Sequence, residues 1–323
     1  MMPSGAKKML LVSGRAFPEL AEEVAACLGI KPTPTKLFDF SNGEIFVRFL
    51  DSVRGCDVFA LQSHTSPINE WIMEQLIMVD ALKRASARRI TVVTPFFGYA
   101  RQDKKNRGRE PISARLMTDL FATAGASRLM AVDLHTAQIQ GFFDGPVDHL
   151  TALPPLADYI RSNYTGELVI VAPDAGRVKT AEKFAAVLNS SLAFLHKRRS
   201  RETPNQVHMR EVVGEVDGRH CVIVDDMIDT AGTVVQGAEV LLAQGAERVT
   251  AAATHGVFSG PAIDRLKNAP IDEVVITNTL PLPEEKRLDK IVVLSIAAIL
   301  ADAIRAVFED ASVSDLFNDQ NQL

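Results

Sequence analysis

The chain has 323 residues, more than one ordinary hydrophobic core accommodates, which predicts two domains of roughly 150 residues each. Its 47% hydrophobic and 23% charged residues are typical of a globular protein and exclude extensive disorder. Lys and Arg number 35 against 40 Asp and Glu, and this net charge of -5 argues against generic binding to nucleic acid or anionic membranes. Any phosphate site must therefore be local.

Cysteine usage and hydropathy predict an intracellular protein. Cys27, Cys56 and Cys221 are few and unclustered and lie in or beside apolar segments, which is typical of free buried thiols in a reducing compartment. No stretch approaches the roughly 18 apolar residues of a membrane span. Residues 1–14 lack the long apolar region and cleavage site of a secretory signal. We therefore expect a cytoplasmic location.

Short apolar runs rich in β-formers alternate with helical patterns along the chain. Such alternation predicts βαβ units, a parallel sheet buried on both faces, and hence an α/β fold. The predicted strands cover residues 8–14, 57–63, 90–96, 128–134, 168–174 and 221–226, and the predicted helices cover residues 17–29, 68–85, 178–189 and 232–246.

The two halves of the chain share an approximate internal repeat. Residues 55–100 and residues 218–260 each contain a strand, a loop, a long helix, a strand and then an aromatic and glycine turn. A match of this kind suggests duplication. We expect an N-terminal domain over residues 1–150 and a C-terminal domain over residues 151–323.

The two copies differ at the end of their first strand. The first copy has Gln62, Ser63 and His64 there, whereas the second has Asp225 and Asp226. Since ligands of open α/β sheets bind at the carboxyl ends of strands, this difference predicts that only the second half kept an acidic ligand site.

The stretch VIVDDMIDTAGTV, residues 222–234, ends an apolar run in acids and opens a predicted helix. Asp225 and Asp226 could bind ribose hydroxyls or Mg²⁺. The turn after them could hold a phosphate on backbone N–H groups and hydroxyls at a helix N-terminus. The alternative is an Asp or Thr N-cap, which accounts for one acid rather than three. The turn comprises Asp229, Thr230, Ala231, Gly232 and Thr233.

Two further strand ends carry single candidate ligands. Asp133 and His135 are two residues apart in an apolar run, which predicts that they share one face of a strand. His135 could offer a neutral imidazole to a metal, although a lone His is more often a core residue. Asp174 precedes a small-residue turn suited to diphosphate, although a lone Asp is more often a turn former.

Three other segments are predicted loops, each of which could have a purely structural role instead of binding a ligand. FSNGE, residues 40–44, predicts a hairpin turn with positive φ at both Asn42 and Gly43. The basic run over residues 104–109 is a solvated loop or a phosphate contact. HKRRSRETPNQ, residues 196–206, has no hydrophobic periodicity and predicts an exposed loop.

The DD and DTAGT motifs together resemble the phosphoribosyl-diphosphate loop of type I phosphoribosyltransferases, which is shared by enzymes that make and enzymes that consume this metabolite. YARQDKKNRGR, DLHTAQIQGFFD, APDAG and HKRR then resemble class I ribose-phosphate diphosphokinases, in the same order over essentially the whole chain. The resemblance implies two tandem, pseudo-duplicated type I phosphoribosyltransferase-like α/β domains with parallel sheets.

The implied activity is transfer of the β,γ-diphosphoryl group of ATP to the C1 hydroxyl of ribose 5-phosphate. The products are AMP and 5-phosphoribosyl 1-diphosphate, a precursor for nucleotide, histidine and tryptophan biosynthesis. A phosphoribosyltransferase that consumes this product and a non-catalytic regulatory relative of the synthase are the alternatives.

The resemblance also assigns roles to residues. Lys197 and Arg199 form the catalytic pair on a closing loop, and His135 and Asp174 help to bind the Mg²⁺ carried with ATP. The ATP-binding residues are Phe40, Asn42, Gly43, Glu44, Arg101, Gln102 and Asp103, with the first four reaching adenine from a neighbouring subunit. The ribose 5-phosphate residues are Arg199, Asp225, Asp226, Asp229, Thr230, Ala231, Gly232 and Thr233.

Assembly and regulation are implied in the same way. The family relationship implies a homohexamer, with phosphate and ADP as effectors, and no nucleic-acid or membrane partner. The implied effector site comprises Ser52, Arg54, Ser312, Ser314 and Phe317.

Overall fold

The computed structural model describes residues 7–197 and 210–317, which divide into two compact units. Among these residues, the first unit comprises residues 7–151, 279–281 and 296–317, and the second comprises the remainder. The first unit thus includes C-terminal segments that a single division near residue 150 assigns to the other half. The division into domains 1–150 and 151–323, which we inferred from the internal repeat in the sequence, stays a prediction.

The first unit contains a five-stranded sheet in the order β1-β4-β5-β6-β7, and every neighbouring pair is parallel. β4 is buried along its whole length, as expected of a central strand covered on both faces. The strands are β1 (Met9–Ser13), β4 (Asp57–Leu61), β5 (Arg89–Thr94), β6 (Arg128–Val132) and β7 (Val147–Leu150).

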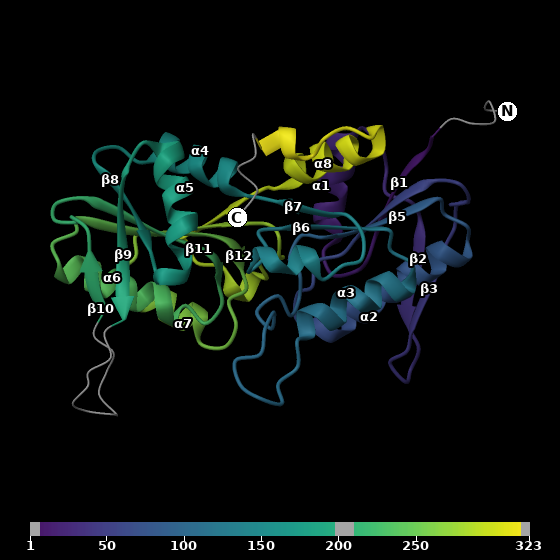
Figure 1. The fold of residues 1–323 in the computed structure, drawn as a ribbon, viewed down its shortest axis with the longest axis horizontal. Helices are drawn as coiled ribbons and strands as arrows, with labels where there is room; N and C mark the ends of the chain where they lie inside the picture. The colour runs from purple at the N-terminus through teal and green to yellow at the C-terminus, as the bar shows by residue number, and fades with distance from the viewer. Residues whose placement is uncertain (1–6, 198–209, 318–323) are drawn as a thin grey trace. The chain divides into compact units, whose positions relative to one another are not determined.

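Helices of the first unit pack in two pairs, α1 with α8 and α2 with α3 (Figure 1). α1 has a proline in its first turn and ends at Gly29, whose φ of 70° closes the helix. A hairpin of β2 (Thr35–Asp39) and β3 (Ile45–Phe49) forms a separate two-stranded sheet. The helices are α1 (Pro18–Leu28), α2 (Ile68–Arg84), α3 (Ser113–Ala124) and α8 (Ala297–Glu309), with short 3₁₀ turns η1 (Ala137–Gly141) and η4 (Ser314–Phe317).

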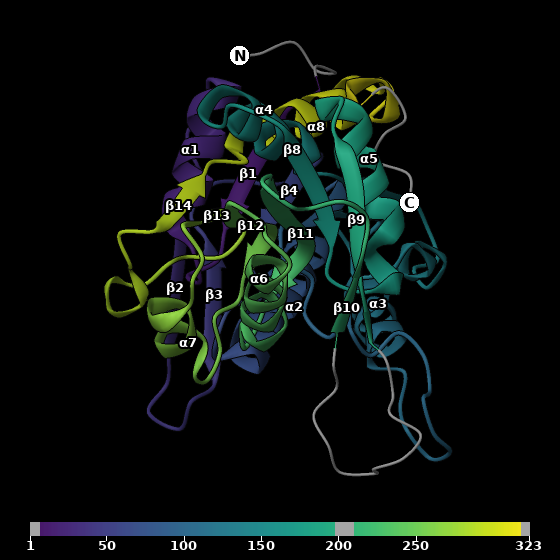
Figure 2. The ribbon, with the colours of Figure 1, turned by 90° about the vertical axis from the view of Figure 1, so that its left-hand side faces the viewer.

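The second unit contains a seven-stranded sheet in the order β10-β9-β8-β11-β12-β13-β14 (Figure 2). All neighbours are parallel except β9 and β10, which pair antiparallel. The strands are β8 (Leu168–Ala172), β9 (Ser191–Lys197), β10 (Arg210–Val213), β11 (His220–Ile228), β12 (Arg248–Gly256), β13 (Glu273–Thr277) and β14 (Ile291–Leu294). The helices are α4 (Leu153–Asn163), α5 (Val178–Leu188), α6 (Gly232–Ala243) and α7 (Ala262–Asn268), with 3₁₀ turns η2 (Ala175–Arg177) and η3 (Glu284–Lys286).

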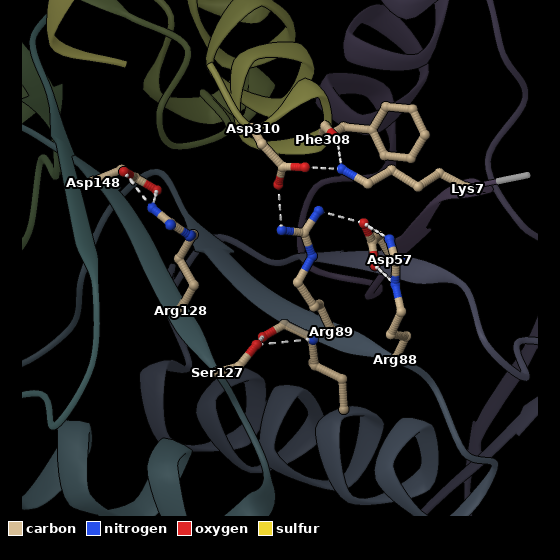
Figure 3. A network of polar contacts seen from close by, with 10 residues as sticks. Lys7, Asp57, Arg88, Arg89, Ser127, Arg128, Asp148, Phe308 and Asp310 are labelled. Carbon is tan, nitrogen blue, oxygen red and sulfur yellow. Dashed lines mark hydrogen bonds and ion pairs between the residues drawn. The ribbon is translucent and has the colours of Figure 1, made fainter. Parts of the chain in front are cut away.

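An ionic network joins the end of α8 to the starts of the strands in the first unit (Figure 3). Asp57, whose side chain is buried, accepts hydrogen bonds from Arg88 at 2.8 and 2.6 Å and from Arg89 at 2.5 Å. Arg89 also donates to Asp310 at 2.7 Å, and Lys7 pairs with the same carboxylate. The network therefore links the C-terminal helix to the sheet edge opposite the strands' carboxyl ends.

Two local expectations from the sequence are wrong. β6 ends at Val132, and Asp133 has a φ of 38°, so Asp133 and His135 lie beyond the strand and its alternation does not put them on one face. Of the free cysteines, Cys56 and Cys221 are buried as expected, but Cys27 is exposed near the end of α1. No helix among the described residues is long and apolar enough to cross a membrane.

Candidate active site

Asp225 and Asp226 lie on β11, whose strand geometry continues past them. The strand reaches Ile228 because residues 225, 227 and 228 still pair with Ala253, His255 and Gly256 of β12. The expectation that the strand ends at Asp226 is therefore short by two residues. Asp226 is buried and Asp225 is partly buried, so both carboxylates sit inside the sheet edge rather than on an open loop.

Arg177 holds the two carboxylates together. Its Nε lies 3.0 Å from Asp225 Oδ1 and its Nη2 lies 2.8 Å from Asp226 Oδ1. The guanidinium side chain is only 13% exposed, so these contacts are little screened by water. A planar fork of N–H donors suits such a shared grip on two acids. The cation that adjacent buried anions require is thus supplied from the neighbouring strand β8 through η2.

One arginine does not balance two buried acids. Burial, and after it the neighbouring charge of Asp226, raise the pKa of Asp225 to about 8, and Arg177 acts in the opposite direction. The ligand-free pair therefore retains a proton at neutral pH. An incoming cation, or hydroxyl groups that donate hydrogen bonds, would stabilise the fully ionised pair.

The turn after β11 is held by its own unit. Ala231 has a left-handed φ of 59°, and α6 begins at the next residue, Gly232. Ser259 donates a hydrogen bond to the carboxylate of Asp229, and Arg265 Nη1 donates to the carbonyl of Thr230 at 2.9 Å. The alternative of an Asp or Thr N-cap is wrong, because the capping residue is Ala231 and it makes no side-chain cap hydrogen bond.

Gly232 stands where the turn approaches a cation closely. A Cβ atom built on this residue would lie 3.2 Å from Arg265 Nη1, which is tighter than ordinary van der Waals contact. Gly232 and Thr233 form the first turn of α6, so their backbone N–H groups point out of its N-terminus. The arrangement brings together a helix N-terminus, a hydroxyl residue and an acid pair at the carboxyl end of one strand.

Asp174 lies at the end of the adjacent strand. β8 and β11 are parallel neighbours, so Asp174 and the acid pair share one edge of the sheet. Asp174 Oδ1 accepts a hydrogen bond from the N–H of Gly176 at 2.9 Å and caps the short turn η2. This places a third carboxylate on the loop that also carries Arg177.

The expected adenine-binding hairpin is exposed in the first unit. Phe40 is 49% exposed, with its ring 5.2 Å from that of Phe38. Gly43 has a φ of 87° and its N–H donates to the carbonyl of Phe40, but Asn42 does not have positive φ. The expected turn with positive φ at both Asn42 and Gly43 is therefore wrong. One glycine in the left-handed region closes a longer loop, with Asn42 accepting from the N–H of Glu44 at 3.2 Å.

The expected ATP residues at positions 101–103 have different surroundings. Arg101 and Gln102 are exposed, and the side chain of Gln102 accepts a hydrogen bond from Ser113 at 2.6 Å. Asp103 is 5% exposed and accepts from Thr136 at 2.7 Å and from Gln138 at 2.5 Å. Asp103 therefore ties this loop to the segment that follows His135, which indicates that it orders the loop.

The remaining predicted residues are spread over both units. His135 belongs to the first unit and Asp174 to the second, and His135 is partly buried. Lys197 is the last residue of β9 and pairs in register with Arg210, whereas Arg199 lies outside the described residues. No cluster of three His, Cys, Asp or Glu suited to a metal occurs in residues 7–197 and 210–317.

The predicted effector residues all belong to the first unit. Ser52, Arg54 and Ser312 are exposed, and Ser314 is partly buried. Phe317, at the end of η4, is 5% exposed. The C-terminal segment is thus fixed to its unit by an aromatic anchor.

Comparisons with known proteins give a consistent family. The model of the N-terminal domain of ribose phosphate pyrophosphokinase matches residues 9–125, and that of the phosphoribosyl synthetase-associated domain matches residues 200–318. Ribose-phosphate pyrophosphokinase from Streptomyces avermitilis is 63% identical over 318 residues, which are 98% of each chain. The chain belongs to the ribose-phosphate pyrophosphokinase family.

Further members of the ribose-phosphate pyrophosphokinase family agree over the same length. The protein of that name from Bifidobacterium longum is 60% identical over 97% of this chain and 93% of its own. The crystal structure of phosphoribosylpyrophosphate synthetase from Mycobacterium smegmatis is 56% identical with a TM-score of 0.89, covering 94% of this chain and 100% of that one. These matches confirm the family resemblance and the α/β fold class.

Reasoning from the sequence missed Arg177. The signal was present, because Arg177 follows Asp174 by three residues in PDAGR, at the end of a predicted strand. It became decisive only with the strand order, since β8 and β11 are neighbours although about fifty residues separate them.

Proposed function

We propose that this member of the ribose-phosphate pyrophosphokinase family makes 5-phosphoribosyl 1-diphosphate and AMP from ribose 5-phosphate and ATP. The observation that carries the proposal is the acid pair of β11, held by Arg177 beside the turn that opens α6. The full-length relatives favour this synthesis over the two alternatives. A phosphoribosyltransferase or a regulatory relative would need another explanation for identity of 60% or more over nearly the whole chain.

Ribose 5-phosphate would bind with its two ends at different parts of this loop. The 5-phosphate accepts hydrogen bonds from the backbone of residues 229–233 at the N-terminus of α6, where the helix dipole favours an anion. The ribose 2- and 3-hydroxyls donate to Asp225 and Asp226. These donors stabilise the ionised carboxylates, whose unliganded state holds a proton.

ATP would bind through residues of the first unit. Phe40 is an exposed aromatic ring that can stack on adenine, and Asn42 and Glu44 beside it can hydrogen-bond to the base edge. Arg101 and Gln102 are exposed donors suited to phosphate, whereas buried Asp103 orders their loop.

The donor set fits Mg²⁺ carried with ATP. Mg²⁺ prefers oxygen ligands and is held by one or two carboxylates together with substrate phosphates, so it needs no cluster of three protein ligands. Asp174 supplies such a carboxylate at the sheet edge that also carries Asp225 and Asp226, and His135 is the second proposed ligand. When bound, the ion neutralises charge on the triphosphate.

The chemical step moves a diphosphoryl group. The C1 oxygen of ribose 5-phosphate forms a bond to the β-phosphorus of ATP while the bond from that phosphorus to the α,β-bridging oxygen breaks. AMP leaves with this oxygen, and the C1 hydroxyl loses its proton to solvent. The positive charges of Lys197 and Arg199 would lie beside the β-phosphoryl oxygens and stabilise their negative charge in the transition state. Arg199 would also contact ribose 5-phosphate.

Assembly, regulation and location complete the proposal. We propose a cytoplasmic homohexamer in which the hairpin of one subunit serves the ATP site of a neighbour. Phosphate and ADP would act at Ser52, Arg54, Ser312, Ser314 and Phe317, where two exposed serines and an exposed arginine accompany a segment anchored by the buried Phe317.

The test follows the label of the transferred phosphorus. Purified protein is incubated with Mg²⁺, ribose 5-phosphate and ATP labelled at the β-phosphorus. We expect unlabelled AMP and a labelled sugar diphosphate in equal amounts. Failure to form AMP under any effector condition would support the regulatory relative. Release of labelled diphosphate from 5-phosphoribosyl 1-diphosphate with a nucleobase would instead support the consuming transferase.

A further inference from the structure

Glu74 is a fully buried carboxylate in the middle of α2, far from the acidic loop in sequence. It accepts hydrogen bonds from the backbone N–H of Arg15 at 2.7 Å and from Arg15 Nε at 2.5 Å. Gln62 Nε2 adds a third donor at 2.8 Å. Since a buried anion requires partners of this kind, Glu74 fixes both the backbone and the side chain of Arg15.

The terminal nitrogens of the Arg15 guanidinium bind the hairpin of β2 and β3. Its two terminal nitrogens donate to the two carboxylate oxygens of Asp39, at 2.9 and 2.6 Å. The guanidinium also lies 5.7 Å from the centre of the Trp71 ring. A bidentate pair whose cation is already oriented by a buried acid defines the position of Asp39 in two directions.

Asp39 is the point at which this grip reaches the adenine-binding loop. It is the last residue of β2, its pairing with Ile45 is the last rung before the turn, and Phe40 follows directly. Residues 40–44 are all exposed, and the hairpin forms a two-stranded sheet of its own (Figure 1). β3 packs against α2, and the ion pair at Asp39 adds a polar anchor at the point where β2 passes into the exposed turn.

We propose that Arg15 and Asp39 are positioning residues for ATP, which hold the tip of the hairpin so that Phe40, Asn42 and Glu44 meet the adenine base in a fixed geometry. The inference rests on the proposed function. It adds to that function a connection from the exposed loop to buried Glu74, through the ion pairs of Arg15 with Asp39 and with Glu74. Neither Arg15 nor Asp39 needs to touch the nucleotide.

The sign of the expected effect separates positioning from simple electrostatics. Asp39→Asn removes a negative charge beside a site for an anionic triphosphate, which by charge alone would tighten ATP binding. Loss of the bidentate pair loosens the hairpin and weakens ATP binding. We therefore expect Asp39→Asn and Asp39→Ala each to raise the KM for ATP about tenfold, the scale of one lost charge-assisted hydrogen-bond pair.

The other kinetic constants and the stability complete the first experiment. KM for ribose 5-phosphate and Tm should stay near the wild-type values, because Asp39 is exposed and Arg15 keeps Glu74. Arg15→Lys, which keeps the charge but loses the bidentate fork, should give a smaller rise in the KM for ATP. Asp80→Asn is the matched control, since it breaks an exposed Arg–Asp pair at 2.7 Å on α2 itself. We expect no change in the control.

A double-mutant cycle tests whether Asp39 acts through the hairpin. In a Phe40→Ala background the additional rise caused by Asp39→Asn should shrink to within twofold, because the stacking ring that it positions is gone. An undiminished rise in that background would overturn the inference, as would an unchanged KM for ATP in both Asp39 variants. A fall in Tm together with a lower kcat and equal rises in the KM for ATP and the KM for ribose 5-phosphate would show that Asp39 has a structural role only, and would also overturn the inference.

The wild-type assay separates this inference from the proposed function. If the wild-type protein forms AMP and the Asp39 variants match it, the positioning role is wrong and the function stands. If the wild-type protein forms no AMP from ATP and ribose 5-phosphate, the proposed function itself has failed.

Discussion

The strand end after β4 in the first unit and the end of β11 in the second correspond to each other in the repeat that the sequence predicts, yet their polar side chains are stabilised differently. In the first unit Gln62 bonds to Glu74, and Ser63 donates to the carbonyl of Thr279 at 2.7 Å. His64 contacts Gln75 at 2.8 Å and accepts from the N–H of Gly98 at 2.9 Å. Burial lowers the pKa of His64 to about 4, so it is neutral at pH 7.

The second unit has a pair of acids at the corresponding place. Asp225 and Asp226 share Arg177, and the pKa of Asp225 is raised by burial and by its neighbour. The first strand end is also filled, because a Cβ on Gly14 would lie 2.3 Å from Gln62 Oε1. The polar side chains after β4 thus satisfy one another within the first unit, whereas the acid pair of β11 would be stabilised in its fully ionised form by a ligand.

The largest effect should come from Lys197, which tests whether the chemistry belongs to the second half. Lys197→Ala should lower kcat by on the order of a hundredfold or more, as removal of one preorganised transition-state donor does. KM for ribose 5-phosphate should change little, because the lost interaction forms in the transition state. Steady-state AMP release measures both constants. A kcat near the wild-type value would remove Lys197 from the mechanism.

Asp225→Asn should trade binding for stability. Because the folded pKa of Asp225 is about 8, against an ordinary 3.8, the folded ligand-free protein binds more protons than the unfolded chain between these values. Its stability therefore falls as pH rises through this window, and the neutral amide removes that loss. We expect the Tm advantage of the variant to grow from pH 5 to pH 8, while KM for ribose 5-phosphate rises about tenfold or more.

Thermal unfolding across pH and steady-state kinetics measure these two effects. Asp264→Asn, an exposed acid on α7, serves as the control because it lies outside the acid pair. An Asp225→Asn variant that is less stable than wild type at pH 8 would contradict the expected gain in stability. An unchanged KM for ribose 5-phosphate would contradict the expected role of Asp225 in binding the sugar phosphate.

Gln62→Ala should have the reverse pattern in the first unit. It leaves buried Glu74 without one of its donors and removes the acceptor of the Ala16 N–H at 3.1 Å. An unsatisfied buried group costs about 1–3 kcal/mol, so Tm should fall by several degrees. KM for ribose 5-phosphate should stay within twofold of wild type. A large rise in that constant would show that the first strand end still serves the sugar phosphate.

The smallest effect should come from Asp310, in the network away from the strands' carboxyl ends (Figure 3). Lys7 and then Arg89 lower the pKa of Asp310 to about 2, from an ordinary 3.8. The stabilisation is present above the unfolded pKa and is lost as pH falls from about 4 toward 2. Asp310→Asn should lower Tm by about one or two degrees at pH 7, as exposed ion pairs do, with unchanged kinetics. A Tm difference that persists at pH 2 would exclude the ion pairs as its cause.

Local patterns predicted the α/β alternation and several of its elements. The helix expected over residues 68–85 is α2 at Ile68–Arg84, and that expected over residues 178–189 is α5 at Val178–Leu188. These agree because burial of one helix face leaves a periodic signal in the sequence. The antiparallel strand β10 and the return of α8 to the first unit have no such local signal, since both depend on partners distant in the chain.

The site divides along the same line. The acids of β11 and the turn before α6 were predictable, because an apolar run that ends in DD and DTAGT is unusual chemistry for a strand end. Arg177, and the chain from Glu74 through Arg15 to Asp39, join residues from separate elements. Their roles emerge only when strand order and side-chain distances are known.

Equilibrium binding of ribose 5-phosphate by titration calorimetry tests the contrast between the two strand ends most directly. We predict one ribose 5-phosphate per chain in the wild type and in Gln62→Ala, and strongly weakened binding in Asp225→Asn. Two equivalent sites per chain, or binding that survives in Asp225→Asn and is lost in Gln62→Ala, would contradict the account.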